Sequence, residues 1–321
     1  MTAVAGQQRR LMARALSRAA DASVAEVLAS ARGSSGVCRR IGVTGPPGAG
    51  KSSLIAALVR HRLSRDGDIA VLAVDPTSPV SGGAILGDRI RMEDLAHNPR
   101  VYIRSLASRS SHDGLADNLP DIFEIVENAG FAEAILETVG VGQVEYAVRH
   151  VVDTTLLVLM PGAGDQVQAM KSGILETADI FVVNKADQPG ARQLAVELAS
   201  VLKLKASDSQ GVAEGWLPPI VSTAVQDPES VAALAKAIDR HQAWLAGHQD
   251  VRKRLEKRRA QHVESLVVRR VAEVLNELPV EFLHEPLASL YEAVVKRLTE
   301  TAPSSDVARD PRKRAVHSKA R

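Results

Sequence analysis

The segment from Gly45 to Ser52 constrains the fold of this 321-residue chain more than any other. It reads Gly-Pro-Pro-Gly-Ala-Gly-Lys-Ser and fits G-x-x-x-x-G-K-[ST], the phosphate-binding loop of nucleoside triphosphatases. Residues 40–44 before it predict a short buried strand, and residues 53–59 after it predict the first turns of a helix. A plain glycine-rich turn is the alternative interpretation, and the full spacing in this context disfavours it.

The residue types in this loop suit a triphosphate. Glycines let the backbone bend around an oxyanion so that its N–H groups point inward, and the following helix N-terminus adds a positive dipole end. Lys51 would reach the β- and γ-phosphates, and the Ser52 hydroxyl would bind Mg²⁺. The expected nucleotide contacts from this stretch are Gly45, Pro46, Pro47, Gly48, Ala49, Gly50, Lys51, Ser52 and Ser53.

Strand and helix signals alternate along the middle of the chain. Apolar runs that predict strands occupy residues 69–74, 101–103, 134–136, 155–160, 180–183 and 220–221. Helical patterns lie at residues 89–96, 119–129, 144–152, 191–201 and 229–245. The predicted fold class is therefore α/β, with a mainly parallel sheet flanked by helices. Ligands of such sheets bind outside the carboxyl ends of the strands.

Four segments follow from these patterns. Residues 1–36 are expected to form an N-terminal helical extension, with a break and an N-cap at residues 21–23. Residues 37–246 are the predicted nucleotide domain, and residues 247–302 a C-terminal helical arm with a long helix over 252–278. The arm is too thin for a core of its own, so its apolar stripes must pack on the main domain or on a second copy. Residues 303–321 are expected to be a disordered basic tail.

Composition narrows the choice of compartment and partner. A net charge of +2 gives no strong field for nucleic acid, and the basic clusters of the last third are read as solvated surface. Cys38 is the only cysteine, which excludes an intrachain disulfide and points to a reducing compartment. The Arg-rich start could mimic an organellar transit peptide, but its helical spacing favours a structural helix. No apolar run is long enough to span a bilayer, so we expect a cytoplasmic protein without membrane or nucleic-acid partners.

A second motif is typical of guanine recognition. Asn184, Lys185 and Asp187 follow a predicted strand as N-K-x-D, the guanine-reading motif of GTPases. The Asp187 carboxylate would accept from the guanine N1–H and exocyclic amine, a donor pair that adenine does not present. The motif in register with the phosphate loop favours GTP over ATP. After the next strand, Ser222, Thr223 and Ala224 occupy the place where a backbone N–H supports guanine O6.

Acidic residues at strand ends indicate a magnesium site. Asp75, Asp88 and Glu137 are the expected acids, because Mg²⁺ prefers hard oxygen ligands and keeps several waters. Asp88 could equally cap the helix that follows it, and the two roles are compatible. Glu137 begins Glu-Thr-Val-Gly, whose Gly140 N–H is expected on the γ-phosphate.

The residue after Gly140 predicts slow hydrolysis. It is Val141, where many GTPases carry a glutamine that orients the attacking water, and an apolar side chain cannot do this. Gln143 lies two positions further on, and a role at the start of a helix is as compatible with its place as a functional one. A partner or a second segment would then have to complete the site. Asp165, Gln168 and Lys171 recur at a spacing of three and would share one helix face, with a plain solvated face as the alternative.

Together these blocks resemble the MeaB/ArgK GTPases over nearly the whole chain. The blocks are G-P-P-G-A-G-K-S, D-P-T-S with G-G-A-I-L-G-D-R-I-R-M, E-T-V-G-V-G-Q, P-G-A-G-D-Q-V-Q-A-M-K and N-K-A-D, in that order. The resemblance implies a homodimeric GTPase whose C-terminal arm dimerises and whose GTP cycle gates adenosylcobalamin delivery to an acyl-CoA mutase and release of damaged cofactor.

The same resemblance assigns residues. It makes Asp75, Asp88 and Glu137 the Mg²⁺-linked acids. It makes Asp165, Gln168 and Lys171 a third switch that carries the signal of the mutase and accelerates hydrolysis. Lys51, Asp88, Glu137 and Lys171 are therefore the expected catalytic set.

One loop departs from the family pattern. Residues 108–116 read Ser-Arg-Ser-Ser-His-Asp-Gly-Leu-Ala, where the family has a glycine-richer loop, so the partner could be a mutase other than the methylmalonyl one. Three other functions compete: a nucleotide-gated scaffold with negligible turnover, a metal-delivery GTPase, and a kinase. The single cysteine and the scattered histidines disfavour metal delivery, and the chain shows no kinase-type catalytic loop.

Overall fold

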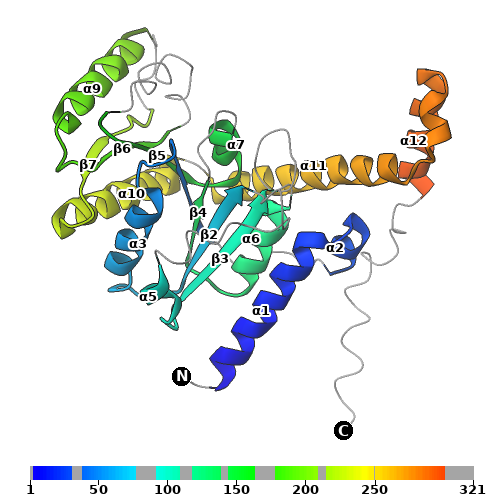
Figure 1. The fold of residues 1–321 in the computed structure, drawn as a ribbon, viewed down its shortest axis with the longest axis horizontal. Helices are drawn as coiled ribbons and strands as arrows, with labels where there is room; N and C mark the ends of the chain where they lie inside the picture. The colour runs from blue at the N-terminus through cyan, green and yellow to red at the C-terminus, as the bar shows by residue number, and fades with distance from the viewer. Residues whose placement is uncertain are drawn as a thin grey trace. The chain divides into compact units, whose positions relative to one another are not determined.

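In the part of the chain that the structure describes, seven parallel strands form one sheet (Figure 1). The computed structural model describes residues 3–30, 38–76, 92–108, 118–138, 144–162, 178–208, 215–248 and 250–300. Within them the strand order is β3-β2-β4-β1-β5-β6-β7, and every neighbouring pair is parallel. The strands are β1 (Arg39–Thr44), β2 (Ile69–Pro76), β3 (Val101–Ser108), β4 (Glu133–Glu137), β5 (Thr154–Leu159), β6 (Ile180–Asn184) and β7 (Ile220–Thr223). The predicted parallel α/β sheet is confirmed.

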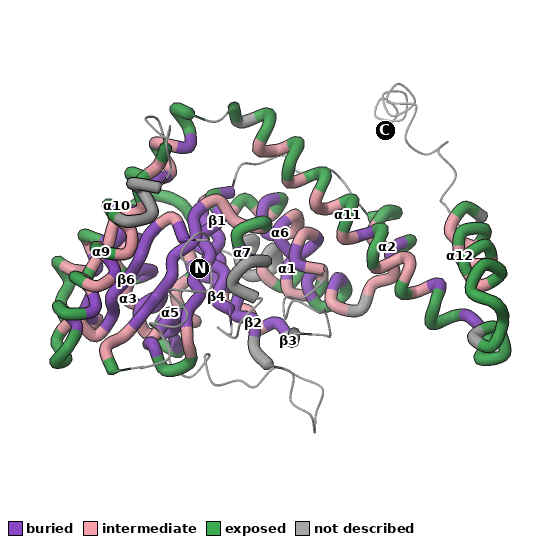
Figure 2. The backbone as a smooth tube through the Cα atoms, turned by 90° about the horizontal axis from the view of Figure 1, so that it is seen from above, coloured by how far each residue is buried: buried purple, intermediate pink, exposed green. Residues whose placement is uncertain are grey.

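Helices cover both faces of the sheet, and its inner strands are buried along most of their length, whereas the edge strands β3 and β7 are largely half-buried (Figure 2). On one face, α3 (Lys51–Arg62), α5 (Glu93–Ala96) and α10 (Pro228–His248) enclose a core with residues such as Ile41 and Val158. On the other face, α1 (Ala3–Asp21), α6 (Leu119–Asn128), α7 (Val144–Val151) and α9 (Ala191–Asp208) pack on the alternate strand residues. Burial on both faces explains why these strands read as unbroken apolar runs.

Several elements are longer than their sequence signals. Strand β3 runs to Ser108 rather than ending near residue 103, because β2 pairs with it residue by residue as far as Pro76 opposite Ser108. Helix α9 runs to Asp208 rather than 201. Of the helix expected over residues 89–96, the described part is α5. Among the described residues, no helix combines the length and the apolar character that crossing a membrane requires.

Contacts group the chain into two compact units, residues 1–20 with 32–262 and residues 21–31 with 263–321. The second unit contains α2 (Val24–Ser30), the later part of α11 (Val251–Glu277), η2 (Val280–His284) and α12 (Leu287–Glu300). Ser23 and Glu26 form a capping box at the start of α2, and the Val24 N–H donates to Glu273 on α11. This grouping differs from the sequential division into four segments, which stays a prediction.

Buried charges attach the first part of α11 to the sheet of the first unit. The Arg258 guanidinium contacts both oxygens of Asp153, at 2.5 and 2.6 Å, and Glu127 at 3.2 Å. Arg40 on β1 also pairs with Glu127, at 2.8 Å, and its backbone N–H donates to Asp153. The four side chains are 14% exposed or less, so their charges depend on each other for compensation.

Replacing Arg258 with Ala should lower the free energy of unfolding by about 2–4 kcal/mol, because two nearly buried carboxylates lose a guanidinium. Urea unfolding without nucleotide measures the change. Arg259→Ala is the matched control, since this neighbour on the same helix is exposed and should cost less than about 0.5 kcal/mol. Equal losses of unfolding free energy in the two variants would contradict a stabilising role for the ion pairs of Arg258.

Candidate functional site

The phosphate loop lies at the carboxyl end of β1, in the position that the motif predicts. Gly45 has φ 140°, and a Cβ there would lie 2.1 Å from the carbonyl oxygen of Val158 on β5. Gly50 has φ 84° and is the N-cap residue of α3, and a Cβ there would lie 2.7 Å from the Asn184 amide nitrogen. These two positions need glycine both for the left-handed backbone and for the close approach of neighbouring strand ends.

Lys51 is folded back onto the loop. Its Nζ donates to the carbonyl oxygens of Gly45 at 2.8 Å and Pro46 at 3.1 Å, and the side chain is buried. The ammonium is thus positioned against the loop by backbone oxygens. Phosphate oxygens carry more negative charge than these carbonyl groups and would compete with them for the same donors.

Ser52 and Glu137 meet across the loop. The Ser52 hydroxyl donates to Glu137 Oε1 at 2.7 Å, and both residues are buried. Parallel pairing of β1 with β4 sets Val43 opposite Glu137, which brings the acid to the first turn of α3. A hydroxyl and a carboxylate are the hard oxygen donors that Mg²⁺ binds together with phosphates, so this pair fits the metal expected here.

Asn184 connects the N-K-x-D segment (residues 184–187), where we expect the base to bind, to the phosphate loop. Its side-chain amide donates to the Ala49 carbonyl at 2.8 Å, and its Oδ1 accepts from the Thr223 hydroxyl at 3.0 Å. Lys185 has φ 56°, rare for a residue with a side chain, and its Nζ lies 3.4 Å from the sulfur of Met160. Asn184 is buried, whereas Asp187 is exposed. The motif thus divides into a buried connecting amide and an exposed carboxylate available to a base.

The segment after β7 also lies beside this loop. The Ala186 N–H donates to the Thr223 carbonyl at 2.9 Å, which holds the two strand ends together. Ser222 is exposed, and Ala224 is buried. The backbone N–H of Ala224 already donates to the Ser230 hydroxyl at 3.1 Å, so it would have to exchange this partner to bind a guanine oxygen.

Other predicted site residues lie outside the described part of the chain. These are Asp88, Gly140, Asp165, Gln168 and Lys171, together with Val141 and Gln143 and most of the loop over 108–116. Asp75 lies in β2, one residue from its end, but its side chain is not described. Their roles stay predictions.

Sequence reasoning missed three neighbours of the site. Thr44 and Thr138 are paired through their hydroxyls beside the start of the phosphate loop, and Met160 follows β5 and contacts Lys185. The one available signal was position, because each residue lies at or next to the carboxyl end of a strand of the parallel sheet.

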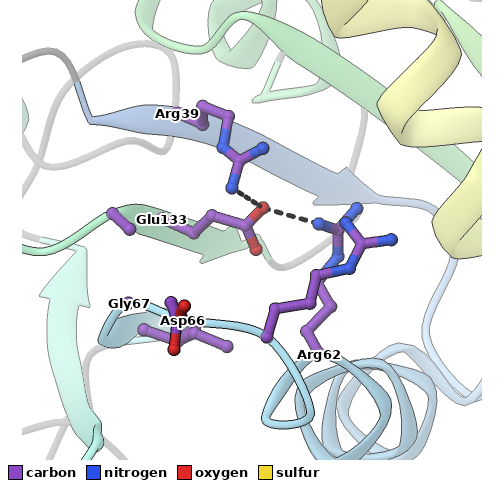
Figure 3. Close-up of a pocket in the computed structure, with 8 residues that line it drawn as sticks. Arg39, Arg62, Asp66, Gly67 and Glu133 are labelled. Carbon is purple, nitrogen blue, oxygen red and sulfur yellow. Dashed lines mark hydrogen bonds and ion pairs between the residues drawn. The ribbon is translucent and has the colours of Figure 1, made fainter.

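A small pocket lies at the opposite ends of the strands (Figure 3). Its walls include Glu133, which pairs with Arg39 at 3.2 Å and with Arg62 at 2.6 Å. The cavity volume is about 10 Å³. That is room for about one water molecule, so this pocket does not compete with the loops as a nucleotide site.

Comparison with known proteins agrees with this geometry. The family model described as methylmalonyl-CoA mutase-associated GTPase MeaB matches residues 9–279. A protein of Mycobacterium tuberculosis named "Probable GTPase" is 41% identical over 225 residues, 68% of this chain and 66% of the relative. The "Methylmalonic aciduria type A homolog, mitochondrial" of Caenorhabditis briggsae is 38% identical over 203 residues, 62% of this chain and 48% of that protein.

A solved structure supports the fold. The crystal structure of a protein called LAO/AO transport system kinase superposes with a TM-score of 0.57 at 24% identity, covering 92% of this chain and 94% of that chain. At this level of identity the likeness concerns the fold alone.

Replacing Asp187 with Asn should weaken GDP binding about 100-fold, because the amide cannot accept both hydrogen bonds of the guanine edge. Titration with a fluorescent GDP analogue measures the dissociation constant, with an ADP analogue as the second ligand. Asp66→Asn is the matched control, because Asp66 is exposed and lines the small pocket at the opposite ends of the strands. An unchanged preference for guanine over adenine in the Asp187 variant would contradict the assignment.

Proposed function

The chain belongs to the MeaB family of GTPases, which hydrolyse GTP to GDP and phosphate, and from this premise we propose that it is a chaperone of an adenosylcobalamin-dependent acyl-CoA mutase. In this proposal GTP binding and hydrolysis gate the loading of adenosylcobalamin and protect or reactivate the mutase. The observation that carries the nucleotide part is the Ser52–Glu137 pair beside a glycine loop that Asn184 connects to the base-reading segment.

GTP would be held at both ends of these linked loops. The triphosphate would lie at the N-terminus of α3, where backbone N–H groups and the Lys51 ammonium replace its water. Asp187 would accept from the guanine edge. Because the Asn184 amide binds the Ala49 carbonyl, contacts with the base and with the phosphates order the same backbone.

Ser52 and Glu137 would hold the Mg²⁺ of the nucleotide, with Asp75 and Asp88 as the further proposed acids. Bound there, the metal supplies charge neutralisation of the β- and γ-phosphates. The 2.7 Å contact between the two side chains keeps their oxygens together. Glu137 would act on the metal directly or through water.

Slow turnover without a partner follows from the residue after Gly140. Val141 cannot orient water, so we propose that the segment with Asp165, Gln168 and Lys171 completes the site when the mutase docks. These residues lie outside the described part of the chain, and the assignment rests on the resemblance.

Two alternatives remain in the proposal. A nucleotide-gated scaffold would bind GTP with negligible turnover even with a partner present. A metal-delivery GTPase would need a transfer ligand, and Cys38 suits this poorly because it is 1% exposed and burial raises the pKa of its thiol to about 12.

We expect the mutase to stimulate hydrolysis. Adding the cognate adenosylcobalamin-dependent acyl-CoA mutase should raise kcat by about tenfold or more, because the partner supplies the missing orientation of water. Phosphate release under saturating GTP measures the rate, and Lys171→Ala should lose the stimulation. A cobalamin-independent acyl-CoA enzyme is the control partner. Equal rates with every partner would favour the scaffold.

Which mutase the chain serves is open to the same assay. We propose a partner other than methylmalonyl-CoA mutase, because residues 108–116 depart from the family loop. Stimulation by methylmalonyl-CoA mutase equal to that by any paralogous mutase would contradict this choice.

The second unit carries a surface suited to dimerisation. Among the described residues of this unit, ten large apolar side chains are exposed by more than a third: Leu28, Val263, Val267, Val268, Leu275, Val280, Phe282, Leu287, Tyr291 and Val295. Exposed apolar residues at this density are typical of protein interfaces. We propose that a second copy of the chain covers them, as the family resemblance implies.

Replacing Leu287 and Tyr291 together with Asp should convert the dimer into a monomer. The two side chains are 82% and 70% exposed and stand one helical turn apart on α12, so the charges would be buried in the interface. Sedimentation equilibrium measures the mass, and Glu292→Lys on the same helix is the control. A dimer that survives in the double variant would place the interface elsewhere.

A further inference from the structure

Two buried threonine hydroxyls meet beside the start of the phosphate loop. Thr44 is the last residue of β1, immediately before Gly45, and Thr138 follows Glu137, the last residue of β4. The Thr138 hydroxyl donates to the Thr44 hydroxyl at 3.0 Å. Thr44 is 0% and Thr138 1% exposed, so the pair is closed to solvent.

Thr138 is fixed by its backbone as well. Its N–H donates to the Val43 carbonyl at 3.1 Å, which continues the hydrogen-bond pattern of β1 and β4 by one residue beyond the end of β4. Bonds from both the backbone and the side chain leave Thr138 little freedom. Glu137, one residue earlier, therefore projects from a point fixed relative to β1 and the loop that β1 feeds.

Packing alone does not require these hydroxyls. Valine has nearly the shape of threonine and would fill the same space without burying a polar group. A hydrogen bond differs from a packed methyl group in being directional, and a partner left alone in the interior carries a desolvation cost. The pair therefore specifies one arrangement of the two strand ends rather than adding much stability.

We propose that Thr138 and Thr44 are positioning residues for Glu137, which set the reach of its carboxylate toward Ser52 and so the Mg²⁺ requirement of nucleotide binding. This inference rests on the proposed role of Glu137 in holding the metal. It adds to that role the two side chains that determine where the carboxylate stands.

The test separates position from stability. Thr44→Val and Thr138→Val each leave one buried hydroxyl without its partner and should lower the urea midpoint of unfolding. The double variant removes both hydroxyls and should recover most of that loss. The Mg²⁺ concentration for half-maximal retention of a fluorescent GDP analogue should nevertheless rise about fivefold in all three variants, the equivalent of about one hydrogen bond.

Conservative and site variants complete the experiment. Thr138→Ser keeps the hydroxyl and should retain the wild-type Mg²⁺ midpoint. Electron paramagnetic resonance of bound Mn²⁺ gives a second readout that does not depend on hydrolysis. If the double variant recovers its Mg²⁺ midpoint together with its stability, the pair is a packing feature and the inference is wrong.

Glu137→Gln distinguishes this failure from failure of the proposed function. A large rise in its Mg²⁺ midpoint, with none in the threonine variants, would overturn the positioning role alone. An unchanged midpoint in Glu137→Gln would overturn the metal role of Glu137 and the inference that rests on it.

Discussion

The parallel pairing of β1 with β4 and β5 is the constraint on which the site depends. It sets Val43 opposite Glu137 on one side and Leu156 on the other, so three strands deliver their carboxyl ends to one place. The Ser52–Glu137 contact and the threonine pair exist because β4 ends beside β1. The closeness of β5 in turn leaves no room for a side chain at Gly45.

A second consequence is that two successive hydrogen bonds join the strand ends after β6 and β7 to the phosphate loop. Thr223 on β7 donates to Asn184 on β6, and Asn184 donates to Ala49 in the phosphate loop. Each group is buried, so breaking one bond leaves a polar atom without solvent to replace it. The N-K-x-D segment and the phosphate loop are therefore held together by buried hydrogen bonds, whereas the Asp187 carboxylate is exposed.

At the amino ends of the strands, charged side chains form ion pairs with one another. Arg40, Glu127, Asp153 and Arg258 attach the first part of α11 to the strand that leads into the phosphate loop. Glu133 similarly joins β4 to Arg62 at the end of α3. Charges at these ends are compensated by each other, whereas the hydroxyl, amide and carboxylate groups at the carboxyl ends remain suited to a nucleotide and its metal. The ion pairs that attach α11 and the groups suited to a nucleotide therefore lie at opposite ends of the strands.

The sequence by itself predicted the alternation of strands and helices and the position of the phosphate loop at the end of the first strand. Strands that are buried on both faces have unbroken apolar sequences, and the phosphate-loop motif consists of consecutive residues. Both features can therefore be recognised in a single sequence. Local sequence patterns predicted neither the end of β3 at Ser108 nor the different surroundings of Asn184, which is buried, and Asp187, which is exposed. Only tertiary structure decided that Asn184 binds Ala49, 135 positions away, that Thr138 meets Thr44 and that Arg258 meets Asp153. These partners depend on the strand order β3-β2-β4-β1-β5-β6-β7, which no periodicity along the chain encodes.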